Sequence, residues 1–133
     1  YMKRAAHILV DRKGGTKSMR NMLEKAASIK DTSRSIVIFP EGTRIPPGNM
    51  GKLHPGVAAL YKHLNIPVVP VAVNSGLLWP RRQFKKKQGT IIIEFLNPIP
   101  SGLEKRKFLT ELSKIIYEAT LRLEKEGGYK NIQ

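Results

Sequence analysis

Short β-branched runs alternate with longer amphipathic segments along this chain of 133 residues. The apolar runs predict strands over residues 6–10, 35–39, 68–74 and 90–96. Apolar residues at helical spacing predict helices over about 16–29, 55–64 and 101–126. Strands that alternate with helices favour right-handed crossovers, so we expect an α/β fold with a mainly parallel sheet flanked by helices. The last strand is expected at an edge or antiparallel.

Glycine, proline and capping residues set the expected ends of these helices. Gly14-Gly15 precedes the first helix, and Pro55 suits the first turn of the second. Ser101-Gly102-Leu103-Glu104 matches a capping box that starts the third, which Gly127-Gly128 ends. No linker is long enough to separate domains, so residues 1–133 are expected to form a single domain.

A cluster of polar residues follows the second predicted strand. Glu41, Gly42, Thr43 and Arg44 come directly after Phe39-Pro40, where an α/β sheet presents its ligand crevice. A guanidinium offers a fork of donors that matches phosphate or carboxylate, and glycine lets the backbone approach a ligand closely. Glu41 can orient Arg44 or accept from a substrate hydroxyl. The segment therefore predicts a small anion site, with a turn tied by a Glu41–Arg44 ion pair as the alternative.

Three segments of the chain resemble, in order, signature blocks of the glycerolipid acyltransferases, the family of 1-acylglycerol-3-phosphate acyltransferases, and a fourth segment resembles a loop and helix that lie between two of those blocks. Phe39 to Arg44 resembles the third block, and Ile8 to Arg12 is similar to the second. Val68 to Val73 resembles the fourth block, an apolar strand broken by proline. Lys52 to Leu60 is similar to the loop and helix that follow the third block. The resemblance covers about residues 1–80 and implies a partial acyltransferase domain.

The resemblance implies acyl transfer from acyl-CoA or acyl-acyl carrier protein to lysophosphatidate, giving phosphatidate, with no cofactor beyond that co-substrate. Arg44 is the first choice for the acceptor phosphate and Arg12 the second, with Asp11 orienting Arg12. Residues 41–43 would shape the site. Pro70 would line or support the acyl slot, with plain core as the alternative. Glycerol 3-phosphate or another lysolipid is the nearer alternative acceptor.

The family's His-x4-Asp block, which supplies the general base, does not occur in these 133 residues. His7 and Asp11 are separated by three residues, and on a strand they would lie about 13 Å apart, too far for a direct hydrogen bond. His54 is interpreted as a loop side chain and His63 as a solvated helix position. No catalytic residue is therefore assigned. Because the chain also opens with Tyr1, we expect it to be the C-terminal portion of a longer acyltransferase domain.

Composition excludes some classes of site and of membrane contact. The chain has no cysteine, and its three histidines lack metal-ligand spacing, so no metal site is expected. The longest apolar stretches fall far short of the roughly 20 residues that a membrane-spanning helix needs. Any membrane contact of these residues is therefore expected to be peripheral. The resemblance to the acyltransferases implies that this contact lies at the cytoplasmic face.

The positive charge of the chain is concentrated in one part of the sequence. Lys and Arg total 24 against 10 acidic residues, and no acidic residue lies between Glu41 and Glu94. Five cations and two aromatic residues fall within Trp79 to Lys87. This pattern suits anionic lipid headgroups, and nucleic acid is not the expected partner. A solvated loop, or a non-catalytic basic module for anionic membrane or nucleic acid, is the alternative.

Overall fold

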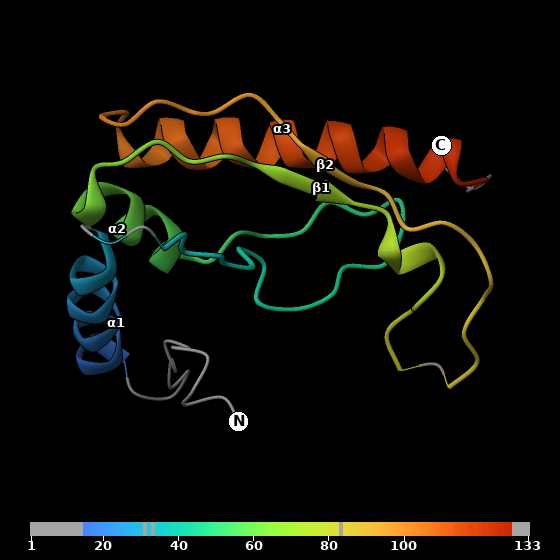
Figure 1. The fold of residues 1–133 in the computed structure, drawn as a ribbon, viewed down its shortest axis with the longest axis horizontal. Coiled ribbons are helices and arrows are strands. Elements are labelled where there is room, and N and C mark those ends of the chain that lie inside the picture. The colour runs from blue at the N-terminus through green and yellow to red at the C-terminus, as the bar shows by residue number, and fades with distance from the viewer. Residues whose placement is uncertain (1–14, 31, 33, 83, 129–133) are drawn as a thin grey trace.

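The computed structural model describes residues 15–30, 32, 34–82 and 84–128. The strand predicted over residues 6–10 lies outside these ranges. In chain order the elements are α1 (Gly15–Lys30), α2 (Pro55–Leu64), β1 (Val71–Val73), the 3-10 helix η1 (Ser75–Leu77), β2 (Ile93–Phe95) and α3 (Lys105–Glu126) (Figure 1). All three predicted helices are confirmed, α2 with both of its predicted ends.

The first residue of α3 differs from the prediction. The helix begins at Lys105, and the residue that caps it is Glu104, whose side chain accepts hydrogen bonds from the backbone N–H groups of Arg106 and Lys107. Ser101 lies in the preceding turn. The carboxylate accepts from two backbone N–H groups that have no acceptor within the helix. Its negative charge is also stabilised by the positive end of the helix dipole. The capping residue is therefore the glutamate of the predicted box, not its serine.

Stacked aromatic rings join α2 to α3 in the main core. The rings of Tyr61 and Phe108 are parallel, with centroids 3.8 Å apart. The Tyr61 hydroxyl donates to the carbonyl of Pro100 and accepts from the N–H of Leu103, so its polar end is satisfied inside the core. The buried neighbours are Val57, Ala58, Ile99 and Leu112. This cluster fixes the start of α3 against α2.

Helix α1 packs against α2 through the apolar stripe that the sequence predicts. Ala26 is fully buried with Leu60 and Leu64, and Met22 and Leu23 pack against them. The end of α2 is set by Asn65, which adopts a left-handed conformation with φ 49° and donates from its N–H to the carbonyl of Tyr61. Asparagine tolerates this conformation better than most residues, so it ends the helix where it stands.

Strands β1 and β2 form a short antiparallel ladder that α3 covers on one face. Ala72 is paired with Glu94 in the register. Ala72 is buried with Ala119 and Leu123 of α3, and Glu94 forms an ion pair with Arg122 of the same helix. Side chains alternate along a strand, so the residues on either side of these two belong to the other face of the sheet.

The mainly parallel sheet predicted from the order of elements is not formed by the described residues, whose sheet is two-stranded and antiparallel. The predicted strands over 68–74 and 90–96 are also shorter than expected. Pro70 has no N–H to donate, so only a single bridge at Val68 precedes β1. Antiparallel pairing was expected for the last strand alone, and there it is confirmed.

The strand predicted over Ser35–Phe39 is wrong for this structure, since these residues lie outside any strand. Val37 is 79% exposed and Phe39 is 83% exposed. A strand is stabilised by backbone hydrogen bonds from a neighbour, and in the described part of the chain no segment supplies that ladder. The apolar pattern is present, but the pairing that it needs is not.

Candidate functional site

A tight turn carries the polar cluster that follows Phe39. The N–H of Gly42 donates to the carbonyl of Phe39 at 3.0 Å, and Gly42 has a φ of 62°. That left-handed conformation strongly favours glycine, which explains its place between Glu41 and Thr43. Glu41 and Gly42 are half-buried, whereas Thr43 and Arg44 are exposed. The turn therefore brings four of the predicted site residues together and leaves the guanidinium at the surface.

The loop after this turn folds back onto it. The N–H of His54 donates to the carbonyl of Pro40 at 2.9 Å, which ties the turn to the start of α2. A Cβ at Gly51 would lie 2.5 Å from Cγ of Glu41 and 2.8 Å from Cγ1 of Ile45. Sequence reasoning missed Gly51, although a glycine in a loop is a signal for such a close backbone approach. Gly51 therefore belongs to the site as the residue against which Glu41 is placed.

A buried carboxylate on α3 holds the middle of the same loop. Oε2 of Glu124 accepts a hydrogen bond from the N–H of Gly48 at 2.8 Å, and Glu124 is only 5% exposed. Burial raises the pKa of Glu124, and the hydrogen bond from Gly48 opposes that shift. Sequence reasoning missed this residue as well. Its signal was a carboxylate directly beside Leu123 in the core-facing stripe of α3.

Glu41 and Arg44 do not form the ion pair that was the alternative to an anion site. No salt bridge joins them in the part of the chain that the structure describes. Arg44 is exposed, and a guanidinium offers a fork of donors that matches phosphate or carboxylate. The alternative of a turn tied by this ion pair is therefore not formed by the described residues, and the anion site stays a prediction.

The remaining predicted residues lie in different settings. Arg12, His7 and Asp11 fall outside the described residues. Pro70 is fully buried just before β1, and its carbonyl accepts from the N–H of Leu96 at 3.0 Å. This placement fits support of the sheet. His54 and His63 are both exposed, as interpreted from the sequence.

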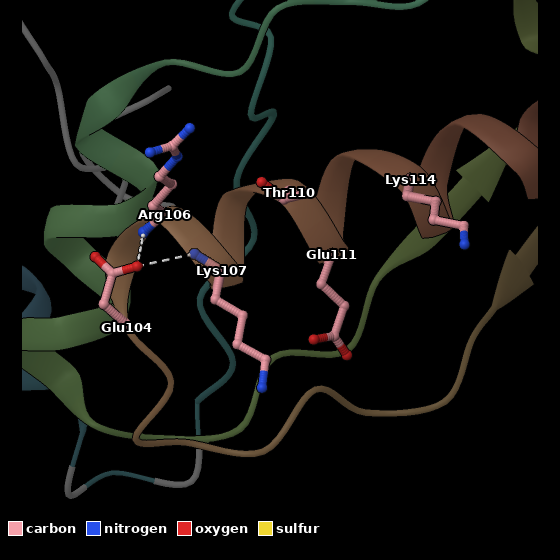
Figure 2. Close-up of a pocket in the computed structure, with 6 residues that line it drawn as sticks. All are labelled: Glu104, Arg106, Lys107, Thr110, Glu111 and Lys114. Carbon is pink, nitrogen blue, oxygen red and sulfur yellow. Dashed lines mark hydrogen bonds between the residues drawn. The ribbon is translucent and has the colours of Figure 1, made fainter.

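Two shallow grooves lie at the start of α3, away from the turn. Figure 2 shows the first, about 470 Å³ in volume, with the Glu104 carboxylate bonded to the N–H groups of Arg106 and Lys107. Those hydrogen bonds lower the pKa of Glu104 and occupy the donors that an anion would use. The second, about 530 Å³, runs between α1, α2 and α3. Residues 41–44 line neither groove.

Within the described ranges, no group of three His, Asp or Glu side chains is placed to hold a metal ion. None of the helices described there has the length and apolar content needed to cross a bilayer.

Comparison with known proteins identifies the family. The Acyltransferase family profile matches residues 1–74. A 1-acyl-sn-glycerol-3-phosphate acyltransferase of Pseudomonas aeruginosa is 37% identical over 84 residues, which are 63% of this chain and 33% of that protein. One of Limnanthes douglasii is 26% identical over 119 residues, covering 89% of this chain and 42% of the plant protein. No solved structure matches.

The chain thus spans between about a third and two fifths of the length of these relatives. The family match nevertheless covers more than half of the chain, and it includes the turn at Glu41–Arg44 and all of β1. The protein belongs to the Acyltransferase family.

Proposed function

We propose that this chain is part of an enzyme that acylates 1-acylglycerol 3-phosphate, lysophosphatidate, to give phosphatidate. The donor is a thioester, acyl-CoA or acyl-acyl carrier protein. The acceptor oxygen forms an ester bond to the acyl carbonyl carbon, the C–S bond breaks, and the hydroxyl proton passes through a base to the leaving sulfur. The names of the relatives from Pseudomonas and Limnanthes support this acceptor.

The observation that carries the proposal is the exposed guanidinium of Arg44 on the turn at Gly42, which forms no salt bridge with any carboxylate among the described residues. A phosphate dianion on the acceptor accepts two parallel N–H hydrogen bonds from the guanidinium of Arg44. Arg12 is the second candidate for the same phosphate. Glu41, packed against Gly51, and Thr43 give the site its shape. Pro70 supports the site from the sheet core.

These residues bind the acceptor, and the proton is removed by a base that they do not contain. The sequence has no His-x4-Asp block, and the two histidines in the described ranges are exposed, with no carboxylate partner among those residues to orient them. We therefore expect no acyl transfer by the purified 133-residue chain. Measurable turnover by this chain, free of host enzyme, contradicts that assignment.

The same proposal covers the setting of the reaction and the full sheet. Lysophosphatidate resides in a bilayer, and we place the reaction at the cytoplasmic face of a membrane, where both thioester donors are found.

Residues 35–39 add to β1 as a parallel strand in a longer protein with the complete domain. The exposed side chains of Val37 and Phe39, and the edge of β1 that no described strand covers, support this pairing.

An acceptor series tests the proposed function. A longer protein that contains these residues and a His-x4-Asp block is assayed with one acyl-CoA and four acceptors: lysophosphatidate, glycerol 3-phosphate, lysophosphatidylcholine and monoacylglycerol. We expect the highest kcat/KM for lysophosphatidate. Monoacylglycerol matches its acyl chain and lacks its phosphate, so it is expected to react poorly. Preference for glycerol 3-phosphate or for monoacylglycerol overturns the assignment.

A further inference from the structure

The segment between η1 and β2 forms a loop that extends away from α1 and α2 (Figure 1). Its cationic part, of which residues 79–82 and 84–87 are described, is called the basic loop here. A backbone hydrogen bond closes its base, because the N–H of Lys87 donates to the carbonyl of Leu78 at 3.0 Å. The N–H of Trp79 donates to the carbonyl of Ser75 at 2.8 Å, which joins the first residue of the loop to η1. The two sides of the loop are therefore held together at its base.

A buried amide anchors the strand that leaves this loop. Asn74 is 1% exposed, and its Oδ1 accepts from the N–H of Ile92 at 2.8 Å. Close packing adds to the anchor, because a Cβ at Gly89 would lie 2.7 Å from Cδ2 of Leu78. A buried side chain whose acceptor is satisfied by one backbone partner holds the two sides of the loop together.

The loop presents cations and aromatic rings together. Trp79 is 55% exposed, and Phe84 is fully exposed. Arg81, Arg82 and residues 85–87 are all exposed. The Nζ of Lys86 lies 5.8 Å from the centroid of the Trp79 ring. Since no acidic residue occurs between Glu41 and Glu94, nothing in this stretch of sequence offsets the charge.

We propose that the basic loop is the site through which this protein binds an anionic phospholipid bilayer. The cations meet the headgroup phosphates, and Trp79 and Phe84 enter the interface, where aromatic rings are favoured. Charge complementarity favours an anionic partner, and the exposed ring of Phe84 gains burial when it enters the apolar part of a bilayer. The inference rests on the membrane setting proposed above. Its test needs no acyl transfer, so the two proposals fail separately.

The single tryptophan of the chain gives a direct measurement. Trp79 fluorescence is recorded while the protein is titrated with vesicles of phosphatidylcholine, alone or with phosphatidylglycerol. We expect a blue shift and saturable binding on the anionic vesicles and roughly 100-fold weaker binding on the neutral ones. Lipids brominated near the headgroup should quench Trp79. No shift on anionic vesicles overturns the proposal.

Two triple variants of equal charge separate the basic loop from net charge. Lys85→Gln/Lys86→Gln/Lys87→Gln removes three loop cations, and Lys105→Gln/Arg106→Gln/Lys107→Gln removes three exposed cations at the start of α3. We expect the loop variant to bind anionic vesicles roughly 10- to 100-fold more weakly and the α3 variant to bind within about threefold of the parent. Equal weakening by both variants overturns the proposal.

A second pair of variants tests the aromatic contribution, and a nucleic-acid titration tests the rival partner. Phe84→Ala is expected to weaken vesicle binding severalfold, whereas Phe95→Ala, at an exposed strand position outside the loop, leaves it unchanged. Circular dichroism checks that each variant is folded. Tighter binding to single-stranded nucleic acid than to anionic vesicles at the same salt concentration overturns the membrane assignment.

Discussion

Glu124, near the end of α3, accepts a hydrogen bond from the backbone N–H of Gly48, which lies 76 residues earlier in the chain. This contact joins the C-terminal helix to the loop that begins at the Glu41–Arg44 turn. The loop is therefore held at three points: by Glu124, by the bond from His54 to Pro40, and by the packing of Gly51 on Glu41. The site that we propose is positioned by long-range contacts.

Loss of the Glu124 carboxylate is expected to release the loop at Gly48. Glu124→Ala leaves the Gly48 N–H without its acceptor and should lower the free energy of unfolding by about 1 kcal/mol. The Gly48 amide should also lose hydrogen-exchange protection. Glu118→Ala, at an exposed position of α3, should change neither quantity. Unchanged protection of Gly48 in Glu124→Ala would show that the bond does not hold the loop.

Glu124 also predicts a pH dependence of stability. Burial raises the folded-state pKa of Glu124 above its ordinary value of 4.5, so the folded protein binds more protons than the unfolded chain. The stability contribution is therefore complete below pH 4.5 and is lost as pH rises through the raised pKa.

Urea unfolding of the parent and Glu124→Gln across this range isolates the contribution. The stability of the parent relative to the variant should fall as pH rises. Glu104→Gln provides a control of opposite sign, because the hydrogen bonds from Arg106 and Lys107 lower the pKa of Glu104. Its carboxylate should stabilise the protein above pH 4.5 and lose that effect as pH falls. Parallel pH profiles for the parent and Glu124→Gln are inconsistent with the raised pKa.

A methyl group at Gly51 is expected to displace Glu41. The added Cβ would lie 2.5 Å from Cγ of Glu41, closer than unbonded carbons approach, so the loop must move. In a longer protein with the complete domain, Gly51→Ala should lower kcat/KM for lysophosphatidate by roughly 10- to 100-fold. Gly76→Ala is the matched control, since its Cβ would meet Pro47 at an ordinary 3.6 Å. Equal activity of the two variants refutes the role of Gly51.

Residues 35–39 are expected to become a strand in the complete domain. Ladder hydrogen bonds protect amides from exchange, so the amides of Val37 and Phe39 should exchange slowly in the longer protein and quickly in the 133-residue chain. The amide of Ala26, inside α1, should be protected in both. Fast exchange at Val37 and Phe39 in the longer protein means that the parallel pairing does not occur.

Local patterns predicted the helices because each helix satisfies its own hydrogen bonds. The apolar stripe of α1 and the two ends of α2, at Pro55 and Asn65, follow from residues that are close together in the sequence. Strands depend on partners, and this is why the pattern at 35–39 did not predict the structure of that segment. Gly51 and Glu124 were missed for a related reason: each acts on a residue that is near in space but not next to it in sequence.

The most direct test of the account is the effect of Arg44→Ala on acyl transfer by a longer protein that contains these residues and a His-x4-Asp block. Loss of charged hydrogen bonds to the acceptor phosphate should reduce kcat/KM for lysophosphatidate roughly 10- to 150-fold, with little change for monoacylglycerol, which has no phosphate. Arg34→Ala, another exposed arginine, should behave like the parent. Transfer to lysophosphatidate at the parent rate by folded Arg44→Ala protein would contradict the assignment of this turn as the phosphate site.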